Sequence, residues 1–272
     1  MGNLNIATDD ACTNIIPVHF TYVTATTAKG KANATFGVLK DIIDGKIGTV
    51  MTVGADKAGK VRIDSAIGLN EFYSDKNGQE ELVSVKRNEG GFVHVVSALA
   101  PDEKTRNTFE TDILITSVNY VEGDEEKGTK DKDVIRGVVF DFRKAILPIE
   151  LSIMNEKGMA FFESLEASPS SPVLIKVWGR QISQTIVKKQ VEESGWGESL
   201  VTETPSSRRE WVIYGSNQEP YVWDDESTIT AAELKKALAD RETYLATIKQ
   251  RRDEYKASQN AAPPIAQSGT SF

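Results

Sequence analysis

The 272-residue chain has little cysteine and histidine: only Cys12, His19 and His94. A single cysteine cannot form a disulfide within the chain, which fits a reducing compartment. These three side chains are also too few for a zinc site of the common Cys/His types. His94 alternates with Val93 and Val95, as a histidine on the solvent face of a strand would. The sequence therefore predicts no metal and no cofactor.

Catalytic motifs are also scarce. The sequence contains no G-x-S-x-G motif of a nucleophilic serine. "GADKAGKV" (54–61) matches G-x-x-x-x-G-K, but Val61 stands where a phosphate-binding loop has Ser or Thr, and strand-like sequence on both sides favours a Gly-rich hairpin turn. "GDEEKGTKDKD" (123–133) lacks the oxygen spacing of a calcium-binding EF-hand. We expect a protein that is not an enzyme, although paired carboxylates are too common to exclude a nuclease.

Long apolar runs are absent, and no stretch approaches the roughly 20 residues of a membrane span. The first twenty residues lack the basic and then apolar order of a signal peptide. We therefore expect a soluble, cytoplasmic protein without a membrane partner. The net charge of −8 argues against bulk attraction to nucleic acid, but a local groove can be basic in an acidic protein.

The first part of the chain consists of short alternating segments separated by turn residues. A polar stretch, "APDEKTRNT" (100–108), ends it, so residues 1–108 are predicted to form a β-rich N-terminal unit. Turns are expected between the segments, including one at "NEGG" (88–91). The predicted strands are residues 33–42, 46–55, 60–69, 81–87 and 91–99.

The second unit, residues 109–223, has one short helical segment among its strands. The helix is predicted at 156–166, and Pro148 should lie at an edge, bend or turn. A helix between the third and fourth strands is the order of the OB fold, a five-stranded Greek-key barrel. The fold class is therefore mainly β. The predicted segments are a strand at 111–122, a long strand or hairpin at 134–155, a strand at 171–183, a loop at 184–207 and a strand at 208–215.

The C-terminal part changes character. "TAAE" (230–233) is a capping box that predicts the start of a helix within residues 224–257. Residues 258–272 carry no charged side chain and have the composition of a disordered tail. An apolar stripe at helical spacing follows the capping box and consists of Leu234, Leu238, Leu245, Ile248 and Tyr255.

The stretch "SPVLIKVWGRQIS" (171–183) alternates at the period of a strand. It places Lys176, Trp178 and Arg180 on the face opposite to three apolar side chains, Val173, Ile175 and Val177. Single-stranded nucleic acid is bound by this combination, because cations follow the phosphates while aromatic rings stack on bases. In the alternative, Trp178 is buried under the C-terminal helix and the stems of the two cations cover its edge.

Further basic and aromatic side chains follow the same pattern. In the N-terminal unit, "TTAKGKANATF" (26–36) offers Lys29, Lys31 and Phe36, which would widen a groove or mediate self-association. Phe142 and its neighbour Phe140 also fit a hydrophobic core. The additional candidates for DNA binding are Lys144, Arg136, Phe142, Trp211, Lys188 and Lys189.

Residues 140–183, about a sixth of the chain, resemble phage-encoded single-stranded DNA-binding proteins with OB folds. In those proteins a helix like "MNEKGMAFFESLE" precedes a strand like "IKVWGR". The resemblance implies sequence-independent binding of single-stranded DNA by Lys176, Trp178 and Arg180. It also implies a role in bacteriophage DNA replication or recombination in the host cytoplasm. Bacterial members recruit partner proteins through an acidic tail, whereas "QSGTSF" keeps only the terminal Phe272.

Two other classes of function fit the same sequence. A virion structural protein would use its β-rich units to pack against neighbouring copies. A protein-binding adaptor or defence inhibitor would use the apolar stripe of the C-terminal helix. Neither would bind nucleic acid, so salt-sensitive affinity for a single strand separates them from the first hypothesis.

Overall fold

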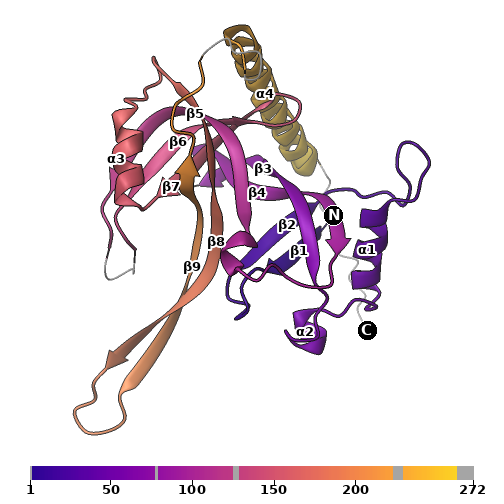
Figure 1. The fold of residues 1–272 in the computed structure, drawn as a ribbon, viewed down its shortest axis with the longest axis vertical. Helices are drawn as coiled ribbons and strands as arrows, with labels where there is room; N and C mark the ends of the chain where they lie inside the picture. The colour runs from indigo at the N-terminus through magenta and orange to yellow at the C-terminus, as the bar shows by residue number, and fades with distance from the viewer. Residues whose placement is uncertain (1, 77–78, 125–128, 223–228, 262–272) are drawn as a thin grey trace, which may run out of the picture.

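The computed structural model describes residues 2–76, 79–124, 129–222 and 229–261. At residues 76, 185–190, 203–207, 231 and 259–261 it describes the backbone alone. The chain forms a four-stranded sheet followed by a closed five-stranded barrel and a long C-terminal helix (Figure 1).

The N-terminal sheet has the strand order β1-β2-β4-β3, with β2 and β4 parallel and the other pairs antiparallel. Its core contains Val18, Phe20 and Val93, and Val38 and Leu39 of helix α1 pack against them. The elements of this part are β1 (Gly2–Ala7), β2 (Ile15–Phe20), α1 (Ala34–Ile43), α2 (Val50–Val53), β3 (Val61–Lys76), β4 (Gln79–Val95) and the 3-10 helix η1 (Glu103–Thr105).

Two predicted strands of this part are wrong, because residues 33–42 and 46–55 contain helices α1 and α2. The side chain of Asn33 caps α1 by accepting from the Thr35 amide. The segment 54–61 joins α2 to β3. It is therefore neither the expected hairpin turn nor a phosphate loop, which leads from a strand into a helix.

The predicted turn at 88–91 is also wrong, because β4 runs through it without a break. A Cβ atom on Gly90 would collide with the ring of Phe20, and one on Gly91 would collide with the carbonyl oxygen of Asp64. The pairing with β3 shifts register between Asp64 and Ala66. The two glycines thus allow close approach beside a β-bulge and do not reverse the chain.

The barrel closes in the order β5-β6-β7-β9-β8, in which β7 and β9 are parallel and the other neighbours are antiparallel. Ile113, Ile135, Leu151 and Ile175 fill its interior, and Phe162 of α3 packs among them. The mainly β class and the helix at 156–166 are confirmed. The elements are β5 (Thr108–Val121), β6 (Lys132–Phe140), β7 (Ile146–Ile153), α3 (Glu156–Ser164), β8 (Val173–Glu192) and β9 (Leu200–Ser216).

Residues 184–207, predicted as a loop, instead contain a two-stranded ribbon. The ribbon continues β8 and β9 from the pair Thr185 and Ser207 to the pair Glu192 and Leu200. Over this length the described part of the chain offers no third strand. We call this ribbon the arm, and Figure 1 shows it projecting from the body of the molecule.

Helix α4 (Ala231–Ala261) follows the barrel, and its capping box is confirmed. The Thr230 hydroxyl accepts from the Glu233 amide at 3.2 Å, and the Glu233 carboxylate accepts from the Thr230 amide at 3.0 Å. Leu234 packs against Leu114 and Leu174 on the outside of the barrel. The helix continues past the expected end at residue 257, and residues 262–272 of the predicted tail lie outside the described ranges. None of the helices described here is long and apolar enough to cross a membrane.

Candidate nucleic-acid interface

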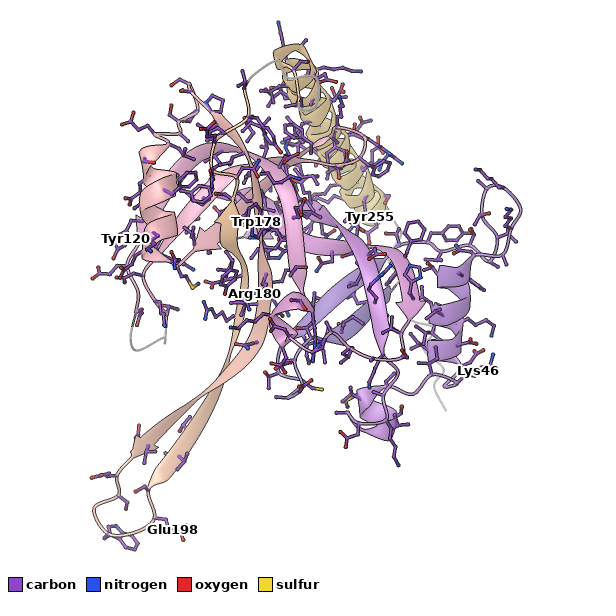
Figure 2. The ribbon with its side chains drawn as sticks, viewed as in Figure 1. Lys46, Tyr120, Trp178, Arg180, Glu198 and Tyr255 are labelled. Atoms are coloured by element: carbon purple, nitrogen blue, oxygen red, sulfur yellow. The ribbon has the colours of Figure 1, made fainter. Side chains whose placement is uncertain are left out.

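The predicted row on β8 lies on the outer surface of the barrel. Ile175 and Val177 point into the core and are fully buried, whereas Trp178 is 42% exposed. Figure 2 labels Trp178 and Arg180 on the same strand. We call the surface formed by Lys176, Trp178, Arg180 and Tyr214 the shelf. The alternation predicted for this strand is therefore confirmed.

The indole of Trp178 lies against the backbone of the neighbouring strand β9. Trp178 is paired with Gly215, and a Cβ atom added at Gly215 would collide with the indole ring. Glycine therefore gives the ring room to lie on the sheet. Helix α4 covers a different part of the barrel, around Leu114 and Leu174. The alternative that Trp178 is buried under the C-terminal helix is wrong.

Arg180 extends the shelf by stacking on a second ring. Its guanidinium carbon lies 3.9 Å from the centre of the Tyr214 ring, and Tyr214 is 54% exposed. Among the described residues, no carboxylate is paired with Arg180. Because a guanidinium is planar and always charged, it can stack on a base or bind a phosphate.

Lys176 is less free than Arg180. Its ammonium group donates to Glu110 at 2.8 Å, and this hydrogen bond raises the pKa of Lys176. Asp112 lies on the same face and accepts from the Tyr221 hydroxyl at 3.1 Å. Carboxylates therefore border the shelf on the β5 side, while its β9 side carries Tyr214.

The remaining predicted residues do not join the shelf. Arg136 donates to Glu150 at 2.6 Å. Lys144, which lies in the turn between β6 and β7, is paired with Glu233 of α4. Phe142, in the same turn, is 86% exposed. Lys188 and Lys189 lie on the arm, but their side chains are outside the described part of the structure.

Trp211 lies in the barrel core, so the prediction that it belongs to an open stacking surface is wrong. It was expected to stack on a base, but it is 8% exposed and its ring centre lies 5.3 Å from that of Phe109 in the barrel core. Ile213, two residues farther along β9, belongs to the same core cluster, so both side chains point inward. Little of its surface is exposed, although Trp211 is among the residues that line the crevice described next.

A basic crevice lies between the N-terminal sheet and β8–β9, and sequence reasoning missed it. Its volume is about 570 Å³. The local signals were two adjacent basic pairs, Lys86–Arg87 and Arg208–Arg209, but which strands face each other depends on tertiary packing. Its charged and titratable lining residues are His19, Lys86, Arg87, Arg209 and Glu210.

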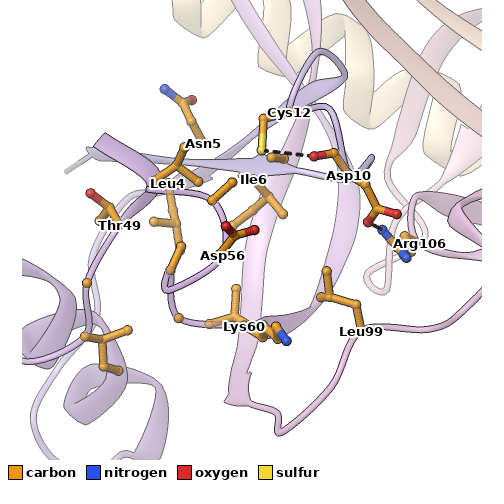
Figure 3. Close-up of a pocket in the computed structure, with 18 of the residues that line it drawn as sticks. Leu4, Asn5, Ile6, Asp10, Cys12, Thr49, Asp56, Lys60, Leu99 and Arg106 are labelled. Carbon is orange, nitrogen blue, oxygen red and sulfur yellow. Dashed lines mark hydrogen bonds and ion pairs between the residues drawn. The ribbon is translucent and has the colours of Figure 1, made fainter. Parts of the chain in front are cut away.

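Another pocket, of about 550 Å³, lies within the N-terminal unit (Figure 3). Arg106 is paired with Asp10 at 2.6 Å, and the Cys12 thiol approaches the Asp10 carbonyl oxygen at 4.0 Å. Lys60 and Asp56, from the segment that resembles a phosphate loop, also line it. Across the described ranges, no three His, Cys, Asp or Glu side chains gather as metal ligands.

The model of the YorF family matches residues 1–251, which include the sheet, the barrel and most of α4. The chain therefore belongs to the YorF family. A comparison with curated proteins finds no match.

Proposed function

We propose that this member of the YorF family binds single-stranded DNA without regard to sequence and without catalysis, and that its barrel is an OB fold. The closed strand order, with α3 between β7 and β8, supports the OB assignment. Binding of this kind fits a role in phage DNA replication or recombination in the host cytoplasm.

The observation that carries the proposal is the shelf. An exposed indole and an arginine stacked on tyrosine lie side by side along β8 and β9. Each offers a flat surface on which any base can stack, and the arginine can also neutralise a phosphate. Affinity from stacking is independent of sequence because every base has a π face.

The first experiment measures fluorescence anisotropy of labelled oligo-dT and of a matched duplex over a salt series. We expect the single strand to bind more tightly, with an affinity that falls as salt rises. Trp178→Ala should weaken binding about 5- to 150-fold, since a stacked base contributes roughly 1–3 kcal/mol. The control Tyr255→Ala removes an exposed ring from α4 and should leave the affinity for oligo-dT unchanged.

A second variant displaces the indole without removing it. Gly215→Ala places a methyl group where the Trp178 ring lies, so the ring must move off the sheet. We expect weaker binding of oligo-dT and a change in tryptophan fluorescence, with an unchanged circular dichroism spectrum. Indifference of the wild-type protein to both oligo-dT and duplex would overturn the proposed function.

A protein-binding role is the second candidate, and the arm favours it. Val191, Trp196, Leu200 and Val201 are all exposed along the arm or at its tip. Two strands without a third are marginally stable in water, so a protein partner would stabilise this ribbon. A virion neighbour, an adaptor target, a replication or recombination protein, or a second copy of the chain would each fit that description.

A further inference from the structure

We propose that the basic crevice between β4 and the base of the arm holds the phosphate backbone of a second stretch of the bound single strand. This inference rests on the proposed function and assigns the N-terminal sheet a direct part in it. The crevice lies along the same strand as the shelf but on its other face, since Gln181 and Ser183, which line it, alternate with Arg180.

Lys86 is the first reason. Its ammonium group donates to the backbone carbonyl oxygen of Glu150 and forms no ion pair with a described carboxylate. Burial lowers the pKa of Lys86, and Glu150 and Glu210 only partly offset this. A partly buried cation without a direct counter-ion is unfavourable, and a phosphate in the crevice would supply that counter-ion.

Arg209 is the second reason. It is exposed on β9, opposite Ser183, and among the described residues it has no carboxylate partner. Its two neighbours in sequence, in contrast, form an ion pair with each other, since Arg208 lies 2.6 Å from Glu210. Glu210 is also paired with Lys132. The one carboxylate that lines the crevice is therefore already engaged by two cations.

The balance of charge in the crevice is opposite to that of the molecule. Lys86, Arg87 and Arg209 line it together with the single acid Glu210, whereas the whole chain carries −8. Arg87 is held at 2.5 Å by Glu89, so Lys86 and Arg209 supply the unpaired positive charge. A hollow of one sign concentrates its counter-ions, which here are phosphates.

The rest of the lining suits a nucleotide. Side-chain amides and hydroxyls can donate to and accept from sugars and base edges. They come from both the N-terminal sheet and the barrel, so the crevice forms only where these two parts meet. These residues are Asn3, Asn70, Ser84 and Ser183.

The test compares two lengths of oligo-dT in salt titrations of the full chain. A strand of about 5 nucleotides should cover the shelf alone, and one of about 30 should also reach the crevice. For the long strand, the double variant Lys86→Gln/Arg209→Gln should reduce the slope of log K against log salt by about 1.4, since each lost phosphate contact removes about 0.7. For the short strand it should change nothing.

The matched control removes two exposed cations from α4 in Lys236→Gln/Arg251→Gln and should leave both slopes unchanged. Unaltered binding of the short strand also shows that the crevice variant is folded. If Trp178→Ala weakens both strands while the crevice variant keeps the wild-type slope on the long one, the crevice inference is wrong and the proposed function stands. If the wild-type protein binds neither strand, both fail.

Discussion

Asp133 is buried at the start of β6, and neither of its carboxylate oxygens has a hydrogen-bond partner among the described residues. Burial raises its pKa, and the negative charge of Glu163 on α3 raises it further. At a pH between the unfolded and the folded pKa, the folded protein therefore holds a proton that the unfolded chain releases. Its contribution to stability is present below the unfolded pKa and is lost as pH rises through the folded pKa.

Asp133→Asn should therefore flatten the pH dependence of stability. Urea unfolding from pH 4 to pH 8 should show a smaller decline in the free energy of unfolding for the variant than for the wild type. Asp131→Asn is the contrasting control, because the hydrogen bond from the Gly123 amide lowers the pKa of Asp131. Replacing that carboxylate should change the pH dependence of stability at low pH instead. An identical decline in wild type and Asp133→Asn would contradict this account.

Single residues of the shelf were predictable where the reasoning was local. The period of two in 171–183 placed Trp178 outside and Val177 inside, because neighbouring side chains of a strand alternate. Trp211 was not predictable in this way, since a tryptophan beside basic residues fits either a stacking surface or a core. Phe109, which packs against it, is distant in sequence.

At the scale of elements, α4 is held differently along its length. Near its start, Leu234 and the buried Ala237 provide apolar packing. Farther along, the helix contacts the β3–β4 hairpin through ion pairs. These are Arg241 with Glu71, Lys249 with Glu80, Arg252 with Asp75 and Glu80, and Lys256 with Asp75. Salt screens such pairs but does not weaken apolar packing.

The C-terminal half of α4 should therefore loosen in Asp75→Asn/Glu80→Gln, while the first turns stay in place. Hydrogen exchange should be faster after about residue 249 and unchanged near Leu234. High salt should reproduce the effect in the wild type. Uniform exchange along the helix in the variant would exclude this division.

The elements that sequence reasoning missed share a cause. In α1, Thr35, Val38, Leu39 and Ile42 follow helical spacing and Asn33 supplies a cap, but the β-branched residues favour a strand. The sequence of the arm does not alternate regularly between apolar and polar residues, so no period of two marked it as strand. In "NEGG", glycines that normally indicate a turn serve close packing across the sheet.

At the scale of the molecule, one amide network joins the sheet to the barrel. The side chains of Asn88 and Gln181 exchange two hydrogen bonds, of 2.8 and 2.7 Å, and both are buried. The backbone carbonyl oxygen of Gln181 also accepts hydrogen bonds from the side-chain amides of Asn14 and Asn107. This joint lies in the lining of the basic crevice, which includes both residues.

Removing one side of the amide pair leaves the other buried without a partner, which costs about 1–3 kcal/mol. We expect Asn88→Ala and Gln181→Ala each to lower the free energy of unfolding by that amount. The double variant should lose less than the sum, because the second substitution removes no further bond of the pair. Urea denaturation measures this, with the exposed Asn119→Ala as the control. Additive losses would show that the pair is not coupled.

The sequence by itself determined the features that depend on short-range spacing: the strand that carries the shelf, the helix α3 and the capping box of α4. Tertiary structure decided which surfaces meet. It buried Trp211, paired Lys144 with Glu233, and set Lys86 of one unit beside Arg209 of the other. Alternation and capping act within a few residues, whereas a crevice or an ion pair depends on packing between segments far apart in the chain, and no local pattern records that packing.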